Sequence, residues 1–271
     1  MQLLLIYKFD RVSCGLGCGL GDQLRGLITL LQVRQRLSLD FPNVSFVLKV
    51  DISDSILNDF INSNNDDIFE NNCKHIHQHP FLYGDEEPHH QEIMSFIYNQ
   101  KEINVICLTT NAYPKINEID GSMVEFVKNM FHFNDEFHSY MNNKLTTLPE
   151  TFMLYHYRIG DEVLYSQRNL DDINKYIENF RNSLNDNDNP IVLISDSLFL
   201  KNEINKQFPD RVFILNNTPH HISDSNVNID TIVDFCLIQH STEVRTYSNY
   251  RWISNFVFWT SNIFGIPLTR I

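Results

Sequence analysis

The chain has 271 residues, of which 42% are hydrophobic, 12% aromatic and 20% charged. This is the composition of a globular protein, and it excludes a disordered, collagen-like or coiled-coil chain. The formal net charge of −13, from 34 acidic and 21 basic residues, argues against general nucleic-acid binding, because a phosphate backbone would repel so acidic a chain.

Patterns typical of strands and helices alternate from one end of the chain to the other. A buried strand over residues 2–8 is followed by a glycine-rich stretch and by a helix whose apolar stripe begins at Leu24. The first part continues with expected strands over 44–50 and 103–108 and expected helical regions over 54–61 and 125–145, the latter either one long helix or two helices that meet near Asn134. After the break at Leu148-Pro149, strands are expected over 152–157, 190–195, 211–215 and 243–246, and helices over 170–184, 197–207, 229–239 and 249–264.

Strands that alternate with helices are typical of parallel sheets built from βαβ units. Two such series, divided near residue 148, predict an α/β fold of two Rossmann-like domains that face a cleft. We expect residues 1–148 to form one domain and residues 149–271 the other. The last helix is strongly aromatic, and we expect it to pack in the core or to clasp the first domain.

A glycine-rich stretch joins the first strand to the first helix, with Gly15, Gly17, Gly19 and Gly21 close together. Glycines let backbone N–H groups approach a ligand, and a helix N-terminus favours an anion. The dinucleotide-binding fingerprint is incomplete, because Asp22 stands where its third glycine is expected, which disfavours a Rossmann dehydrogenase. The other interpretation is a tight turn with Asp22 as the helix N-cap.

Polar side chains follow strands predicted in the second part, at the edge where ligands bind in open α/β sheets. The residues concerned are His156, Arg158, Asp161 and Glu162 after one strand, Asp196 after another, and Ser248 and Asn249 where we expect the last helix to begin. An arginine at this edge can hold a phosphate with its planar guanidinium. The alternatives are a surface Arg–Asp pair and plain helix caps.

Three further features bear on cofactors and location. Cys73, His75, His77 and His79 alternate, but the usual zinc-ligand spacings are absent, so we predict no metal. The chain has no apolar run near the roughly 20 residues that span a bilayer and no signal-peptide core, so we expect a cytoplasmic protein. Its five cysteines are an odd number, which predicts reduced thiols rather than disulfides.

The order of these segments resembles that of GDP-fucose-dependent fucosyltransferases, above all the alpha-1,6 and nodulation types, with the protein O-fucosyltransferases behind them. The matching segments are GLGDQLRG after the first strand, HYRIGD near mid-chain, LISDS one unit later, and Asp234 with TYSN near the end. They lie in residues 14–26 and 152–250, and residues 50–145 are unmatched. The resemblance implies a GT-B fold, with 1–148 on the acceptor side and 149–271 binding the nucleotide sugar.

The resemblance also implies roles for individual residues. Arg158 resembles the arginine that binds the donor pyrophosphate, and His156 the histidine beside the guanine. Asp234 resembles the acid that reads the guanine edge. Ser248, beside Asn249, resembles the serine that contacts the pyrophosphate.

In the first domain, Gly19, Gly21 and Asp22 match the loop over the donor and acceptor, and the loop of Asp196 in the second domain is compatible with contact to the nucleotide. Two departures from the family pattern stand out. Ile159 occupies the place of the second arginine of the HxRR motif, and the downstream catalytic glutamate falls near Ser166.

The predicted activity is an inverting, metal-independent transfer of L-fucose from GDP-fucose to a glycan hydroxyl, with no cofactor besides the donor. Arg158 would stabilise the departing diphosphate, helped by the N-terminus of the last helix. For the general base we rank Asp22 first and then Asp161 and Glu162. The alternatives are another nucleotide sugar and a nucleotide-binding module without transfer. We expect carbohydrate and nucleotide-sugar partners, and neither nucleic acid nor a membrane span.

Overall fold

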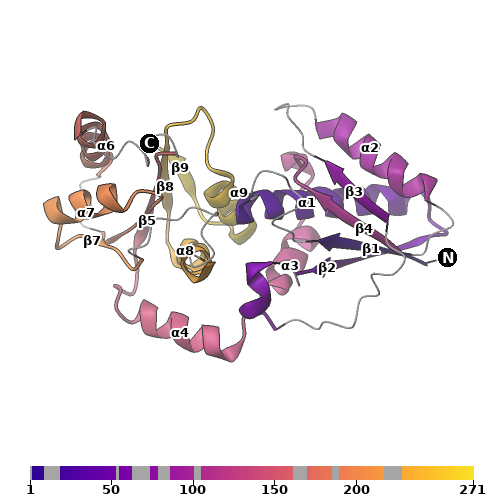
Figure 1. Ribbon diagram of the computed structural model, residues 1–271, viewed down its shortest axis with the longest axis horizontal. Helices are drawn as coiled ribbons and strands as arrows, with labels where there is room; N and C mark the ends of the chain where they lie inside the picture. The colour runs from indigo at the N-terminus through magenta and orange to yellow at the C-terminus, as the bar shows by residue number, and fades with distance from the viewer. Residues whose placement is uncertain are drawn as a thin grey trace. The chain divides into compact units, whose positions relative to one another are not determined.

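The computed structural model describes residues 2–8, 19–52, 55–62, 74–78, 86–100, 105–160, 170–184, 189–216 and 228–271. The chain divides into two compact units, Met1–Asn134 and Asp135–Ile271, and each contains a parallel sheet (Figure 1). The predicted α/β fold with parallel sheets is therefore confirmed. The assignment of an acceptor-side and a donor-side domain stays a prediction.

The first unit is built on a four-stranded sheet in the order β2-β1-β4-β3, with parallel neighbours throughout. Its strands are β1 (Gln2–Lys8), β2 (Ser45–Asp51), β3 (Lys74–Gln78) and β4 (Val105–Thr110). Its helices are α1 (Leu20–Asp40), α2 (Glu86–Asn99), α3 (Gly121–Met130) and the 3-10 helices η1 (Ile56–Asp59) and η3 (Ile116–Glu118).

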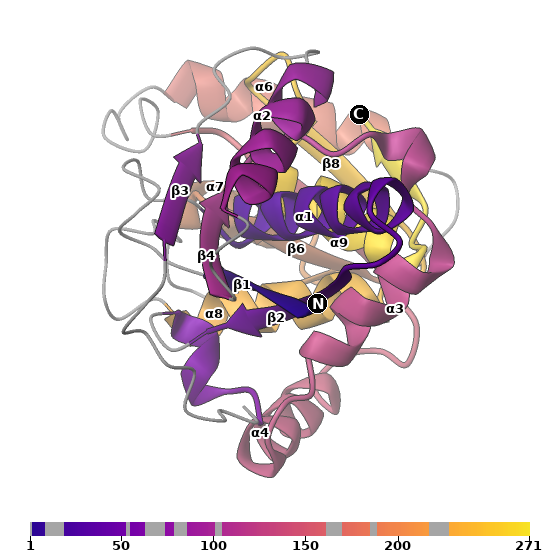
Figure 2. The same cartoon turned by 90° about the vertical axis from the view of Figure 1, so that its right-hand side faces the viewer.

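Helix α1 lies against this sheet and contacts β2, β4, α2 and α3 (Figure 2). The approach is close at Gly26, where an added Cβ would lie 1.7 Å from the carbonyl oxygen of Thr110. The Tyr7 hydroxyl joins the helix to the sheet, with its oxygen 2.9 Å from the carbonyl of Gln23 and 2.8 Å from that of Thr110. Gly26 therefore lets α1 lie closer to the sheet than a residue with a side chain would allow.

The second unit is built on a five-stranded parallel sheet in the order β7-β6-β5-β8-β9. Its strands are β5 (Met153–Arg158), β6 (Ile191–Ser195), β7 (Val212–Phe213), β8 (Val244–Ser248) and β9 (Leu268–Arg270). Its helices are α4 (Asp135–Leu145), α6 (Leu170–Ser183), α7 (Leu198–Gln207), α8 (Asn228–His240) and α9 (Asn255–Phe264). Helices α6 and α7 cover one face of the sheet and α8 and α9 the other (Figure 1).

The last helix begins later than predicted. It starts at Asn255 after the N-cap Ser254, whereas Ser248 ends β8 and Asn249 lies in the following loop. The expectation that Ser248 and Asn249 begin a phosphate-binding helix is therefore wrong, because the strand pairing of β8 with β5 continues to Ser248. Helix α9 contacts α8 and β8 within the second unit, and Phe235 meets Phe264 edge-on at 5.6 Å.

Other elements also differ from the sequence prediction. The helix expected over 54–61 is the short η1. The helical region over 125–145 is two helices, α3 and α4, on either side of Asn134, which is the second of the two arrangements that the sequence allowed. Strands β3 and β9 and helix α2 were not predicted, because a histidine-rich stretch and a three-residue edge strand carry weak hydrophobic periodicity. In the described parts of the chain, none of the helices is long and apolar enough to cross a membrane.

The cysteines correct a second expectation. Cys107 in β4 is disulfide-bonded, so the prediction of reduced thiols is wrong at this position. Cys236 in α8 is a free thiol, and burial raises its pKa to about 12. A thiol that stays protonated in this way is a small core residue rather than a nucleophile.

Candidate active site

Five of the polar residues predicted after the strands of the second part lie at one edge of the second sheet. Strands β6, β5 and β8 are neighbours and run parallel, with Tyr157 paired to Ser195 and Arg158 paired to Ser248. Their carboxyl ends therefore lie side by side, which is where an open α/β sheet binds its ligands. The predictions for His156, Arg158, Asp196, Ser248 and Asn249 converge on this edge.

Asp196 joins the ends of β5 and β6. Its carboxylate accepts hydrogen bonds from the backbone N–H groups of Ile159 (2.9 Å) and Gly160 (3.0 Å) and from Nη1 of Arg158 (2.6 Å). Asp196 is not the helix cap, because the Ser197 hydroxyl accepts the N–H of Leu200 and caps α7. The buried carboxylate thus orients a guanidinium that remains 29% exposed at the sheet edge.

The loop after β8 closes against the loop after β5. The Asn249 backbone N–H donates to the carbonyl of Arg158 (3.1 Å), and its side-chain amide donates to the carbonyl of Ile159 (2.7 Å) and to the Tyr176 hydroxyl (2.6 Å). Gly160 has φ +96°, a conformation that L side chains rarely adopt. The hydrogen bonds of Asn249 therefore fix the backbone on both sides of the Arg158–Ile159 peptide bond.

His156 lies on β5 beneath this edge, with its Nδ1 2.9 Å from the Thr246 hydroxyl. Burial lowers the pKa of His156 to about 4, and the nearby Asp196 and Asp234 carboxylates only partly oppose that shift. At neutral pH the imidazole is therefore uncharged, and it offers a hydrogen-bonding ring without a positive charge.

The pKa of His156 predicts a pH dependence of stability. Between pH 6.5 and pH 4 the unfolded chain binds a proton at this histidine and the folded chain does not, so stability falls as the pH falls through this window. The loss approaches about 3 kcal/mol at pH 4. Urea unfolding from pH 7 to pH 4 should show a shallower loss for His156→Asn than for the unmodified chain, and equal slopes would contradict the assignment.

Asp234 on α8 belongs to a buried polar network. The Asn216 amide donates to its carboxylate (2.9 Å) and to the carbonyl of Asp230 (3.2 Å), while the Lys201 ammonium donates to the carbonyl of Asn216 (2.6 Å). Lys201 is only 1% exposed, and burial lowers its pKa while Asp234, Asp230 and Asp196 favour its charged form. The three carboxylates therefore oppose the pKa shift that burial of the lysine causes.

Sequence reasoning missed Lys201 and Asn216. Lys201 stands on the buried face of α7 beside Leu200 and Ile204, so a lysine in phase with apolar residues is the signal that could have found it. Asn216 follows β7 and carries no local pattern. Its Oδ1 is buried and accepts no hydrogen bond from the residues that the structure describes.

Replacement of Lys201 by methionine tests this network. We expect Lys201→Met to lower the free energy of unfolding by roughly 1–3 kcal/mol, because the Asn216 carbonyl loses its partner and the carboxylates lose a counter-charge. Both tryptophans, Trp252 and Trp259, lie in the second unit, so their fluorescence reports its unfolding in urea. Lys206→Met on the same helix, where the side chain is 69% exposed, is the matched control with an expected change within about 0.5 kcal/mol. Equal effects of the two substitutions would contradict the network.

The described part of the first glycine-rich segment begins the long helix α1. Gly19 is the N-cap, and its carbonyl accepts the N–H groups of Asp22 (3.0 Å) and Gln23 (3.1 Å). The N-cap interpretation of Asp22 is therefore wrong. Asp22 instead follows Gly21 in the first turn and lies 3.2 Å from Arg25.

Arg25 is buried beneath this turn, with its guanidinium 4.0 Å from the centre of the Tyr113 ring. Asp22 therefore faces a buried guanidinium in the first turn of α1. Gly15, Gly17, Asp161 and Glu162 lie outside the described residues.

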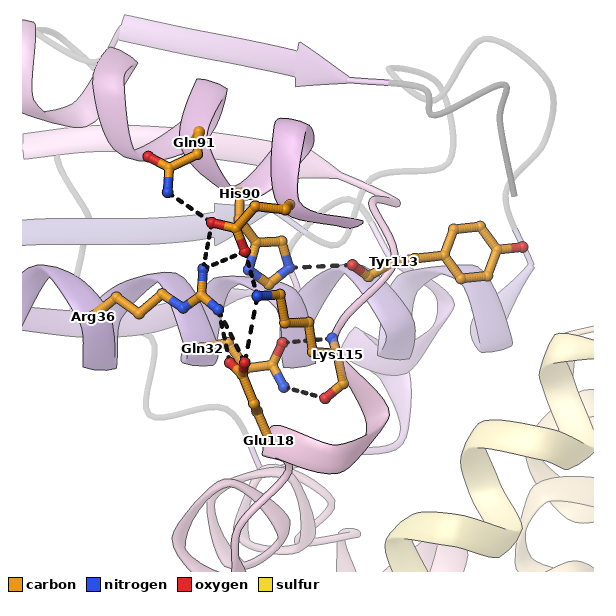
Figure 3. Close-up of polar contacts among 8 residues, drawn as sticks. Gln32, Arg36, His90, Gln91, Tyr113, Lys115 and Glu118 are labelled. Atoms are coloured by element: carbon orange, nitrogen blue, oxygen red, sulfur yellow. Dashed lines mark hydrogen bonds and ion pairs between the residues drawn. The ribbon is translucent and has the colours of Figure 1, made fainter. Parts of the chain in front are cut away.

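A cluster of charged residues ties α1 to α2 and η3 (Figure 3). Arg36 contacts Glu87 at 3.1 Å and Glu118 at 2.8 Å, and Lys115 pairs with both carboxylates. The Gln32 side-chain amide donates from Nε2 to the backbone carbonyl of Lys115 (2.7 Å), and its Oε1 accepts the backbone N–H of Lys115 (2.8 Å). Hydrogen bonds from Lys115, Gln91 and Arg36 lower the pKa of Glu87 to about 2, so this cluster keeps its charges at neutral pH.

Contacts next to this cluster extend to Tyr113 and Arg25, which lie close to Asp22. Buried His90 lies 3.1 Å from the carbonyl of Tyr113 through its Nε2, and burial lowers the pKa of His90 (Figure 3). The Tyr113 ring in turn stacks against the Arg25 guanidinium in a cation–π contact. The charged cluster therefore fixes the segment against which Arg25 and the first turn of α1 are packed.

For metals, the described ranges contain no group of three or more His, Cys, Asp or Glu side chains that could hold an ion. Cys73 and His79 lie outside those ranges, and His75 and His77 are on β3.

Comparison with known proteins places the fold. No protein-family model matches the sequence, and no curated protein matches it significantly. The structure of the NodZ fucosyltransferase from Bradyrhizobium is 12% identical and has a TM-score of 0.56, with 96% of this chain and 91% of that chain covered. A NodZ crystal was soaked with GDP-fucose.

Two further solved structures, both in complex with GDP, have the same fold. POFUT1 is 10% identical with a TM-score of 0.53, and 99% of this chain and 98% of that chain are covered. FUT1 from Arabidopsis thaliana is 11% identical with a TM-score of 0.55, and 100% of this chain and 70% of that chain are covered. The resemblance found in the sequence is thus confirmed at the level of structure: this chain has the fold of the GT-B fucosyltransferases.

Proposed function

We propose that this protein is a glycosyltransferase that moves L-fucose from GDP-fucose to a carbohydrate hydroxyl. The observation that carries the proposal is Arg158, a partly exposed guanidinium oriented by buried Asp196 at the carboxyl edge of the second sheet. The fold supports it, because solved proteins with this fold were crystallised with GDP or GDP-fucose. His156, Asp234 and Ser248 lie on elements of the same unit, as a nucleotide site in that unit requires.

The proposed reaction inverts the anomeric carbon in one step. The acceptor oxygen attacks C1 of fucose, the bond between C1 and the phosphate oxygen breaks, and the bonding electrons leave with GDP. Arg158 neutralises the negative charge that grows on the diphosphate, which is our reason for proposing a metal-independent transfer. The hydroxyl proton passes to a carboxylate, for which Asp22, Asp161 and Glu162 are the candidates.

The assay for this activity is release of GDP from GDP-fucose in EDTA, with and without a mixture of oligosaccharide acceptors. We expect slow hydrolysis alone and faster, saturable turnover with an acceptor. Asp22→Asn, Asp161→Asn and Glu162→Gln, assayed side by side, identify the base as the variant that loses acceptor-dependent turnover while GDP binding is kept. Turnover that requires a divalent metal would contradict the metal-independent mechanism.

Two alternatives have distinct outcomes in the same assay. Turnover of a different nucleotide sugar would keep the fold and change the donor. Nucleotide binding without hydrolysis or transfer would indicate a non-catalytic binding module. A cytoplasmic location stays a prediction, and the disulfide at Cys107 counts against it, because disulfides persist in oxidising compartments.

A further inference from the structure

An exposed aromatic pair follows β8 in the second unit. Trp252 stacks on Tyr250 with ring centroids 5.0 Å apart and an interplanar angle of 20°. Trp252 is nevertheless 43% exposed, although a tryptophan gains free energy when it is buried. By contrast Trp259, the second tryptophan of the sequence, is 1% exposed in the core.

Backbone contacts hold the pair in place. Arg270 on β9 donates from Nη1 to the carbonyl of Arg251 (2.8 Å) and from Nη2 to the carbonyl of Tyr250 (3.0 Å). The Tyr250 N–H donates to the Ser248 hydroxyl (3.2 Å). These hydrogen bonds fix the backbone of the loop that carries the aromatic rings to β8 and β9. The positions of the two rings are therefore set by the fold.

The pair also lies beside the candidate active site. Ser248 is the strand partner of Arg158, and the Tyr250 hydroxyl would be 2.6 Å from a Cβ added at Gly160, two residues after Arg158. Gly160 thus makes room for the tyrosine ring. The aromatic pair borders the loop that carries the guanidinium.

We propose that Tyr250 and Trp252 form a platform that binds a pyranose ring by stacking against its C–H face. This rests on the proposed function, because the site beside Arg158 must hold a sugar near the diphosphate. A rigid, partly exposed aromatic surface beside a polar site provides apolar contact area at little cost in conformational entropy, and a sugar ring presents apolar C–H groups between polar hydroxyls. The ring can come from the donor or from the acceptor.

Tryptophan fluorescence tests the platform directly. In the Trp259→Phe variant, the remaining emission comes from Trp252. The ligands are methyl α-L-fucopyranoside, methyl β-D-galactopyranoside and N,N′-diacetylchitobiose, and separately GDP and GDP-fucose. We expect a saturable change in emission with at least one free saccharide or with GDP-fucose. We expect no such change with GDP, which lacks the sugar. A response to GDP-fucose assigns the donor sugar, and a response to a free saccharide assigns the acceptor. No response to any of these sugars would overturn the proposal.

Substitutions separate this proposal from the proposed function. Trp252→Ala should raise the KM for the acceptor or for GDP-fucose about tenfold while leaving calorimetric GDP binding unchanged, and Trp252→Tyr should restore most of the loss. Since Trp252 is 43% exposed and lies outside the core, the melting temperature should stay near that of the unmodified chain. Normal KM values for both substrates in Trp252→Ala would refute the platform and leave fucosyl transfer standing. Absence of GDP binding in the unmodified chain would instead refute the proposed function.

Discussion

Replacement of Arg158 by alanine is expected to lower fucosyl transfer roughly 10²–10³-fold, because the departing diphosphate loses a guanidinium that is held in place for it. The chain should still fold, since the side chain is 29% exposed and Asp196 keeps its bonds to the N–H groups of Ile159 and Gly160. Steady-state turnover of GDP-fucose and circular dichroism of the same preparation measure the two effects.

A matched control comes from α6 in the same unit. Arg181 is exposed and its guanidinium bonds to Gln207, away from the strand ends, so Arg181→Ala should keep full turnover. Arg158→Lys should recover part of the activity, because a lysine keeps the charge but loses the planar guanidinium. Near-normal turnover of Arg158→Ala would remove Arg158 from the reaction.

Replacement of Gly26 by alanine should have the largest effect on stability. The new Cβ would lie 1.7 Å from the Thr110 carbonyl oxygen and 2.5 Å from the Tyr7 hydroxyl, so α1 must move away from the sheet. We expect a loss of at least about 2 kcal/mol in the first unit. Circular dichroism in urea is the appropriate measurement, because both tryptophans of the sequence lie in the second unit.

Gly121→Ala provides the comparison within the first unit. Gly121 begins α3, and a Cβ added there would meet no atom of the described residues within 4 Å. Its substitution should change stability by less than about 1 kcal/mol. Equal small changes in the free energy of unfolding for Gly26→Ala and Gly121→Ala would contradict the close packing of α1 against β4.

The sequence predicted the alternation of strands and helices because buried parallel strands and amphipathic helices have distinct hydrophobic periods. It also predicted the edge of the second sheet as the candidate site, since polar residues after parallel strands must meet at their carboxyl ends. His156, Arg158 and Ser248 lie on or at the ends of paired strands for this reason. These predictions needed only local patterns and the geometry of parallel sheets.

Features that depend on tertiary contacts escaped prediction. The bond of Asp196 to Arg158 joins residues 38 positions apart, and a local pattern reads Asp196 as a helix cap. The buried charge of Lys201 is likewise hidden, because a lysine in a helix is ordinarily exposed. The role of Gly26 is hidden for the same reason, because the Thr110 carbonyl against which it packs is distant in the sequence.

Calorimetric titration of GDP, UDP and NAD into the purified chain in EDTA, repeated with Arg158→Ala, tests the central claim most directly. We predict saturable binding of GDP that is at least about tenfold tighter than that of UDP or NAD, and strongly weakened binding of GDP to the variant. Equal binding of UDP or NAD, binding that survives in Arg158→Ala, or no binding of any nucleotide would contradict it.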